Sequence, residues 1–283
     1  MNKFIEFMQS GKIMMAAHRG AKTKGLPPEN TIPAYKYAIE LGSDGIETDL
    51  HQTKDGVIIM MHDHDVDRTT DGTGRVCDMT FDEIRKLDAG IKAGEEWKGT
   101  PVPTFEEFLD LVEPYPDLLL NLELKDYPNV EGEISYSTAD KVIEAVERRN
   151  MGDRIMINCF SWKILKYVHD KYGDRYPMHG FYPDFLMQNP EVDVYPYLTY
   201  VCLFNCRLDE NGKVDWSPRK KQELLPKADF DKVKNGLHCE PCVCFTVDTP
   251  ELMKKAIENG VTMFTCNHPG NAIKYLKELG YRD

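Results

Sequence analysis

Short apolar runs alternate with amphipathic segments along most of the chain, which predicts strands and helices in turn. We expect eight strands of this alternation, at 13–17, 45–50, 118–125, 155–160, 178–182, 200–205, 241–247 and 262–267. Helices are expected between most of them, at 31–41, 104–111, 137–149, 162–172, 229–235, 250–259 and 271–279. Eight strands that alternate with helices indicate an α/β protein with a (β/α)8 TIM barrel.

A further apolar run, 57–61, follows the second expected strand after only six residues, His51 to Gly56. That spacing is too short for a parallel crossover, so we expect the run to return as an antiparallel hairpin. From there to Pro103 the sequence is rich in turn residues, with one short helix expected at 81–87. We therefore predict one domain over residues 1–283, with a small inserted subdomain at about 51–103 after the second strand.

Polar side chains stand at the carboxyl-terminal ends of three expected strands. His18 follows the first strand, Glu47 and Asp49 share one face of the second, and Glu123 and Lys125 share one face of the third. In a barrel these ends meet at one mouth. Three carboxylates so placed would repel one another unless a cation neutralised them, and oxygen-only ligands favour Mg²⁺ or Ca²⁺ over zinc. Lys125 is placed either to pair with Glu123 or to meet a phosphate oxygen.

Two histidines stand in positions that suit acid–base chemistry. His18 and His62 each end a strand, and each is followed by a charged residue, Arg19 or Asp63, that can orient it or bind an anion. Two others, His51 and His64, are expected to be exposed loop residues. The remaining histidines have no such context: His169, His179, His238 and His268.

The eight cysteines are scattered through a long chain, which favours the reduced thiols of a cytoplasmic protein over a disulfide framework. Cys239 and Cys242 have the CxxC spacing of half a zinc site, and two further cysteines, Cys202 and Cys206, lie upstream. No second CxxC or HxxxH is present. Cys242 and Cys244 also alternate along an apolar strand, as core thiols do.

The net charge of −12 argues against a nucleic-acid partner and against an anionic membrane surface. The first twenty residues contain no continuous apolar region followed by a cleavage site, and no apolar stretch is long enough to span a bilayer. We therefore expect a cytoplasmic protein without stable membrane insertion. The sequence is compatible with a monomer and with a homo-oligomer.

A series of short motifs extends from about residue 16 to residue 125. In chain order it reads Ala17-His18-Arg19-Gly20, Pro28-Glu29-Asn30-Thr31, Gly45-Ile46-Glu47-Thr48-Asp49, Asp55-Gly56, His62-Asp63, Arg68-Thr69-Thr70 with Gly72 and Gly74, Leu87-Asp88-Ala89-Gly90, Pro103-Thr104 and Glu123-Leu124-Lys125. In order and spacing this series resembles the glycerophosphodiester phosphodiesterase family.

The resemblance implies a barrel with a small insertion and a divalent metal, usually calcium or magnesium. Carried over by position, it implies three metal ligands, Glu47, Asp49 and Glu123. It implies an acid–base pair, His18 and His62, and two phosphate binders, Arg19 and Lys125.

The last two strands depart from the family pattern. Phe245 stands where the family usually has Trp, so its ring is implied to pack against the glycerol. Cys266 and Asn267 stand where the family usually reads Thr-Asp.

The implied activity is metal-dependent hydrolysis of a glycerophosphodiester to sn-glycerol 3-phosphate and an alcohol. One histidine would accept a proton and the other would protonate the leaving alkoxide, in either order, and a cyclic intermediate remains open. An alternative is a lipid substrate, as for lysophospholipase D or sphingomyelinase D, with 181–183 and 185–187 lining an acyl groove. A non-catalytic phosphate-binding protein is a third hypothesis, although mere binding does not require two histidines.

Overall fold

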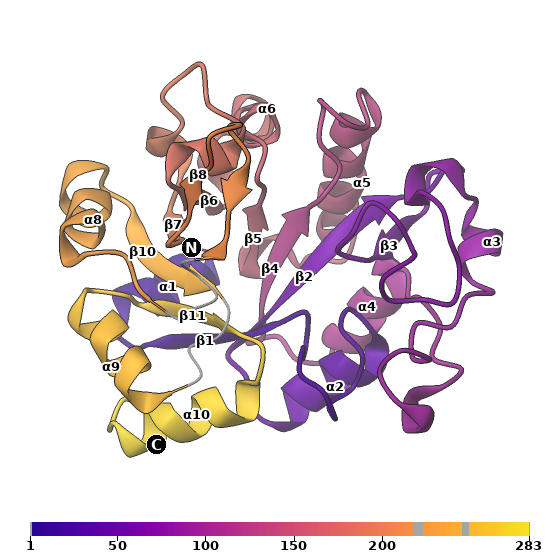
Figure 1. Cartoon of the computed structure of the whole chain (residues 1–283), viewed down its shortest axis with the longest axis horizontal. Helices are drawn as coiled ribbons and strands as arrows, with labels where there is room; N and C mark the ends of the chain where they lie inside the picture. The colour runs from indigo at the N-terminus through magenta and orange to yellow at the C-terminus, as the bar shows by residue number, and fades with distance from the viewer. Residues whose placement is uncertain (1, 218–222, 245–248, 283) are drawn as a thin grey trace.

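The computed structural model describes residues 2–217, 223–244 and 249–282 (Figure 1). Eight parallel strands form a closed barrel in the order β1 (Met14–His18), β11 (Met263–Cys266), β10 (Glu240–Cys244), β7 (Tyr200–Leu203), β6 (Met178–Tyr182), β5 (Ile155–Asn158), β4 (Leu119–Leu124) and β2 (Gly45–Gln52). The ring closes because β1 pairs with β2 as well as with β11. The predicted TIM barrel is confirmed.

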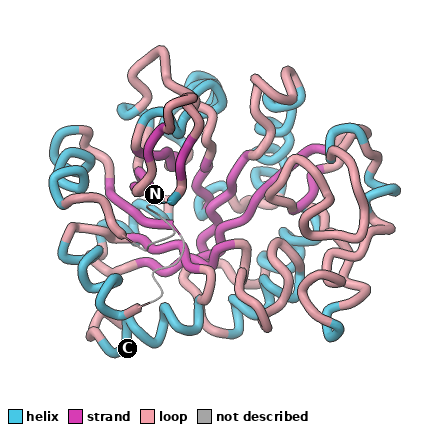
Figure 2. The backbone as a smooth tube through the Cα atoms, viewed as in Figure 1, coloured by secondary structure: helices cyan, strands magenta, loops and turns pink. Residues whose placement is uncertain are grey.

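Helices cover the outside of the barrel, as Figure 2 shows. They are α2 (Ile32–Glu40), α4 (Phe105–Val112), α5 (Ile134–Arg148), α6 (Trp162–Tyr172), α8 (Lys227–Asp231), α9 (Pro250–Glu258) and α10 (Pro269–Glu278). The connection from β6 to β7, which is described throughout, instead holds 3-10 turns at Asp184–Met187 and Tyr195–Tyr197. A small hairpin of β8 (Arg207–Leu208) and β9 (Val214–Asp215) follows β7.

Local sequence explains where α4 begins and how it packs. Thr104 and Glu107 form a capping box, in which each side chain accepts a hydrogen bond from the other residue's backbone N–H. Phe105 and Phe108, one helical turn apart, are buried on the same face against the barrel. The amphipathic pattern therefore sets both the start and the orientation of this helix.

The expected hairpin is present beside the second barrel strand. Strand β3 (Ile58–Met60) pairs antiparallel with β2, with Leu50 opposite Met60 and Gln52 opposite Ile58. The turn includes Gly56 at φ +88°, a backbone conformation that glycine adopts without strain. The carboxyl half of β2 is thereby held on rigid backbone.

The prediction that His51 and His64 are exposed loop residues is wrong. Strand β2 continues through His51, whose side chain is 1% exposed and lies with its Nδ1 2.5 Å from the carboxylate of Asp126. His64 is half-buried, and its Nδ1 lies 2.8 Å from Glu131 Oε1. Both residues gain their partners from the chain that follows β4, a contact that their own neighbours in sequence do not reveal.

The segment between β2 and α4 has a small apolar cluster of its own. It contains Ile59, Met61, Val66, Val76, Ile84, Ala89 and Val102. The expected helix at 81–87 is shorter, because α3 spans Phe81–Ile84. The division of the chain into one domain with an insertion at about 51–103 stays a prediction.

A helix at the amino terminus, α1 (Lys3–Gln9), was not predicted. Asn2 caps it and also donates a hydrogen bond from its amide to the carbonyl of Ile155, the first residue of β5, at 3.1 Å. Phe4 is buried in the main core. The helix therefore lies at the amino-terminal end of the barrel, opposite the predicted site.

No helix in the described part of the chain is long and apolar enough to cross a lipid bilayer.

Candidate active site

A cavity of about 1210 Å³ opens at the carboxyl-terminal ends of the strands. Its walls include His18 from β1, Glu47 from β2, Glu123 from β4 and Lys125 just after β4. His62, which follows β3, joins them. The strand ends thus bring the predicted polar residues to one mouth.

Three carboxylates form the acidic part of this site. Oxygen atoms of Glu47, Asp49 and Glu123 lie within 4.8 Å of one another, and all three residues are buried. Burial raises the pKa of Glu47 well above its ordinary value, and the neighbouring Asp49 and Glu123 raise it further. Burial likewise raises the pKa of Glu123. Within the described chain, Glu47 Oε1 has no hydrogen-bond partner.

These carboxylates fit a divalent cation. A buried carboxylate oxygen without a partner is costly, and a bound ion would remove that cost while offsetting the mutual repulsion. The donors are all oxygens, which matches the preference of Mg²⁺ and Ca²⁺. The acidic triad of Glu47, Asp49 and Glu123 can therefore bind a metal.

Two buried cations lie against the same carboxylates. Arg19 Nε is 3.1 Å from Asp49 Oδ2, and Lys125 Nζ is 3.2 Å from Asp49 Oδ1 and also contacts Glu123. Burial alone would raise the pKa of Asp49, but the charges of Arg19 and Lys125 hold it well below its ordinary value. Asp49 therefore stays ionised under conditions in which Glu47 is protonated. Both cations line the cavity, where they can also meet an anionic ligand.

His18 is held by Asn267, the residue that follows the last strand of the barrel. Its Nδ1 lies 2.5 Å from Asn267 Oδ1, so Nδ1–H donates and Nε2 keeps its lone pair. Nε2 lies 3.7 Å from Glu47 Oε2. Burial lowers the pKa of His18 well below 6.5, and the charge of Arg19 lowers it further. His18 is therefore a neutral imidazole at neutral pH.

His62 has a carboxylate where His18 has an amide. Its Nδ1 lies 2.5 Å from Asp63 Oδ1, and Arg68 Nε holds the other oxygen of that carboxylate at 2.5 Å. Burial and then the charge of Lys125 lower the pKa of His62 to about 4, while Asp63 opposes that shift. Both imidazoles thus have Nδ1 engaged, by a neutral amide at His18 and by a carboxylate at His62.

Sequence reasoning assigned no role to the residues that hold Arg19 and Asp49. Glu29 accepts hydrogen bonds from Arg19 at 2.7 Å and from Arg68 at 2.8 Å. Asn30 donates to Asp49 Oδ2 at 2.7 Å from a backbone at φ +55°. The motif that contains Glu29 and Asn30 marked these residues in the sequence. Their roles were not predictable from it, because their partners come from the ends of β1 and β2 and from the insertion.

Aromatic side chains cover another part of the cavity wall. They are Phe160, Phe181, Phe185, Phe204 and Trp216. Phe160 and Phe181 are stacked, and Phe204 meets Trp216 edge to face. The predicted acyl-groove residues Phe181 and Phe185 thus line the cavity, whereas Phe160, Phe204 and Trp216 were not singled out. Phe245, predicted to bind glycerol, lies outside the described residues.

Imidazoles, buried cations and an acidic triad at the mouth of a (β/α)8 barrel define a class of protein, the enzymes that cleave phosphate esters. Comparison with known proteins identifies the family within this class. Residues 18–189, more than half of the chain, match the glycerophosphoryl diester phosphodiesterase family.

Two curated relatives extend the match over nearly the whole chain. A glycerophosphodiester phosphodiesterase of Caldanaerobacter subterraneus subsp. tengcongensis is 34% identical, over 95% of this chain and 100% of its own. Another of Bacillus altitudinis is 30% identical, over 93% of this chain and 98% of its own. The chain therefore belongs to this family of phosphodiesterases, as its motifs indicated.

Solved structures show the same fold. A glycerophosphoryl diester phosphodiesterase structure from Silicibacter pomeroyi superposes with a TM-score of 0.76 at 21% identity, over 97% of this chain and 98% of that one. A phosphodiesterase of Oleispira antarctica was solved in complex with the product sn-glycerol-3-phosphate. It superposes with a TM-score of 0.75 at 20% identity, over 95% of this chain and 98% of that one.

Proposed function

We propose that this protein hydrolyses glycerophosphodiesters to sn-glycerol 3-phosphate and an alcohol in the cavity at the barrel mouth. The observation that carries this proposal is the pair of histidines, His18 and His62, whose Nδ1 atoms are engaged and whose rings line the cavity beside buried cations and carboxylates. A protein that only bound phosphate would need the cations but not two neutral imidazoles. The names of the relatives and the product complex of the Oleispira antarctica enzyme support the substrate class.

The acidic triad would hold the metal, Mg²⁺ or Ca²⁺. When bound, the ion supplies positive charge that offsets the charge developing on the phosphate oxygens. Arg19 and Lys125 add charge-assisted hydrogen bonds to those oxygens from the same wall of the cavity. Asn30 and Glu29 keep Asp49 and Arg19 in place for these tasks.

The surroundings of the two histidines favour different roles. The Asp63 carboxylate stabilises the protonated form of His62 with a full negative charge, whereas the Asn267 amide offers His18 only a neutral hydrogen-bond acceptor. We therefore assign His18 as the base that accepts a proton from the attacking hydroxyl or water. His62 is assigned as the acid that protonates the leaving alkoxide, helped by the negative charge of the bound phosphodiester.

Leaving groups of different acidity test this assignment. A glycerophosphoryl ester of p-nitrophenol departs without a proton, so His62→Ala should lose little rate on it and much on glycerophosphocholine. His18→Ala should lose rate on both substrates. The reversed pattern would exchange the two roles, and full activity of either variant on glycerophosphocholine would refute the acid–base assignment.

Release of sn-glycerol 3-phosphate from glycerophosphocholine and glycerophosphoethanolamine tests the activity itself. We expect release with Mg²⁺ or Ca²⁺ and loss of release with EDTA. Activity that survives complete metal removal would refute the metal dependence. Absence of release from both compounds by the folded, metal-loaded protein would refute the proposed substrates.

The aromatic wall favours a second candidate function, cleavage of a lysophospholipid. A cavity of about 1210 Å³ exceeds the usual range of small-molecule sites, and one part of its lining is aromatic and aliphatic. Such a surface suits an acyl chain better than a small hydrophilic head group. Phe185 and Leu186, from the connection that lacks an α-helix, belong to this lining.

The test compares lysophosphatidylcholine with glycerophosphocholine in wild type, Phe185→Ala and the milder apolar variant Phe185→Leu. For a lipid substrate, Phe185→Ala should raise the KM for lysophosphatidylcholine about tenfold, the effect of losing one buried aromatic contact, with glycerophosphocholine unchanged. Equal effects on both substrates, or no turnover of the lipid, would refute this second candidate.

A further inference from the structure

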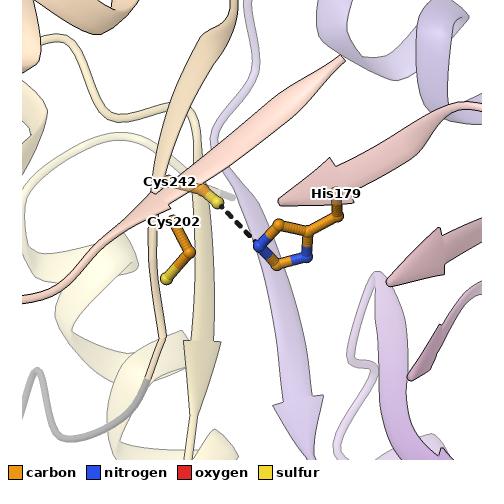
Figure 3. A group of neighbouring side chains, drawn as sticks. All are labelled: His179, Cys202 and Cys242. Carbon is orange, nitrogen blue, oxygen red and sulfur yellow. Dashed lines mark hydrogen bonds between the residues drawn. The ribbon is translucent and has the colours of Figure 1, made fainter. Parts of the chain in front are cut away.

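A histidine and two cysteines meet in the barrel interior, on strands other than those that carry the acidic triad. His179 comes from β6, Cys202 from β7 and Cys242 from β10, three strands that neighbour one another in the sheet. Cys202 and Cys242 are direct partners in the register of β7 and β10. Figure 3 shows the imidazole of His179 turned toward the Cys242 sulfur. All three side chains are 1% exposed or less.

The spacing of the donor atoms suits one small metal ion. Cys242 Sγ lies 3.4 Å from His179 Nε2, and the donor atoms of all three residues lie within 4.8 Å of one another. In a tetrahedral zinc site, bonds of about 2.3 Å to sulfur and 2.05 Å to nitrogen place S and N about 3.5 Å apart, and two sulfurs about 3.8 Å apart. The three side chains therefore need only small movements to coordinate an ion.

The amide of Asn121 can set the histidine tautomer that such an ion requires. Asn121 Nδ2 lies 3.2 Å from His179 Nδ1, while Asn121 Oδ1 has no hydrogen-bond partner in the described chain. A half-turn of this amide about its Cβ–Cγ bond brings Oδ1 to the place of Nδ2, where it accepts from Nδ1–H. Nε2 then presents its lone pair to the ion, with the second nitrogen anchored as in most histidine metal ligands.

The charges also balance. Two thiolates and a neutral imidazole neutralise a divalent ion, so the filled site would bury no net charge. Without an ion, burial raises the pKa of both Cys202 and Cys242, which keeps the two sulfurs protonated and unreactive. Soft sulfur ligands select Zn²⁺ and related ions over Mg²⁺ and Ca²⁺.

We propose that His179, Cys202 and Cys242 bind a thiophilic divalent ion of the Zn²⁺ class. His179 lines the substrate cavity, so an ion can reach the three ligands from there, and a water completes the coordination. The site is distinct from the acidic triad, because the triad lies on β2 and β4, across the ring from β7 and β10.

Cys239, the other half of the CxxC spacing, takes no part in this site. Its thiol lies 3.6 Å from the backbone carbonyls of Tyr195 and Leu198, and it is almost as buried as Cys242. The CxxC spacing thus does not describe this group, which three neighbouring strands bring together. Cys239→Ala is a matched control, since it removes a buried thiol three residues away from the proposed ligand.

The test is titration of the reduced full chain with Co²⁺ in excess Mg²⁺, which occupies the acidic triad. We expect one Co²⁺ per chain with a sulfur-to-cobalt charge-transfer band, because oxygen ligands produce no such band. Cys202→Ala and Cys242→Ala should lose the band, and Cys239→Ala should keep it. Absence of the band in wild type, or its loss in Cys239→Ala, would overturn the proposal.

A second measurement does not depend on the variants folding. X-ray absorption of the wild-type protein with one equivalent of Zn²⁺ should show two sulfur neighbours at about 2.3 Å and one nitrogen at about 2.05 Å. A first shell of oxygen and nitrogen alone would overturn the proposal. Neither measurement uses phosphodiesterase activity, so both are independent of the proposed function.

Discussion

The neutral partner of His18 permits a sharp test of the acid–base assignment. Asn267→Asp places a carboxylate where an amide oxygen now lies 2.5 Å from His18 Nδ1. A full charge about 4 Å from the imidazolium centre is worth about 4 kcal/mol at an effective dielectric constant of 20. That energy corresponds to about 3 pKa units. Because the charges of Arg19 and Lys22 oppose protonation, we expect the pKa of His18 to rise by about 1 to 3 units.

The sign of the kinetic effect follows from the proposed role of His18 as the base. A base must be neutral, so raising the pKa of His18 moves the acid limb of the kcat/KM profile to higher pH by the same 1 to 3 units. Below the new pKa, the rate falls about tenfold for each pH unit. The profile is measured with glycerophosphocholine, and the pKa of His18 is read in parallel by NMR titration of the histidine ring.

Two controls make the result decisive. Asn267→Ala removes the hydrogen bond without adding charge, so it should not raise the pKa of His18. Asp63→Asn is the reciprocal change and should lower the pKa of His62, slowing glycerophosphocholine more than the p-nitrophenyl ester. A raised His18 pKa with an unmoved acid limb would refute His18 as the base. An unchanged His18 pKa in Asn267→Asp would refute the electrostatic reasoning itself.

Three further changes test other parts of the site. Glu47→Gln should abolish the stabilisation by Mg²⁺ that thermal unfolding measures. In EDTA the variant should be nearly as stable as wild type, because burial already favours the protonated carboxyl of Glu47. A large loss of metal-free stability would contradict this. Lys125→Gln should lower kcat/KM roughly 10²–10³-fold, because the phosphate loses a charged partner. The same change should tighten Mg²⁺ binding in calorimetry, since Asp49 and Glu123 lose a competing cation. Weaker Mg²⁺ binding would argue against this. Contacts with Arg68 and Arg19 outweigh burial and lower the pKa of Glu29 to about 2, so Glu29→Gln should cost about 3 kcal/mol at pH 7. Stability from a lowered carboxyl pKa is lost as pH falls from 4.5 through 2, so the gap in urea unfolding should close over that range, and a gap independent of pH would refute the assignment.

The sequence alone determined the architecture and the position of the site. Apolar runs in alternation with amphipathic segments encoded the barrel, and six residues between two runs required the hairpin of β2 and β3. The period of two along a strand placed Glu47 with Asp49 and Glu123 with Lys125 on shared faces. These inferences succeed because they depend on residues a few positions apart, whose relative orientation is set by local backbone geometry.

The tertiary structure decided which side chains meet across strands. Asn267 reaches His18 from the far end of the chain, and Arg68 reaches Glu29 from the insertion. The local CxxC pattern pointed to Cys239, but strand register places Cys242 against Cys202, and the barrel interior adds His179. Spacing along one strand cannot encode such contacts, because they depend on the register and curvature of the closed sheet.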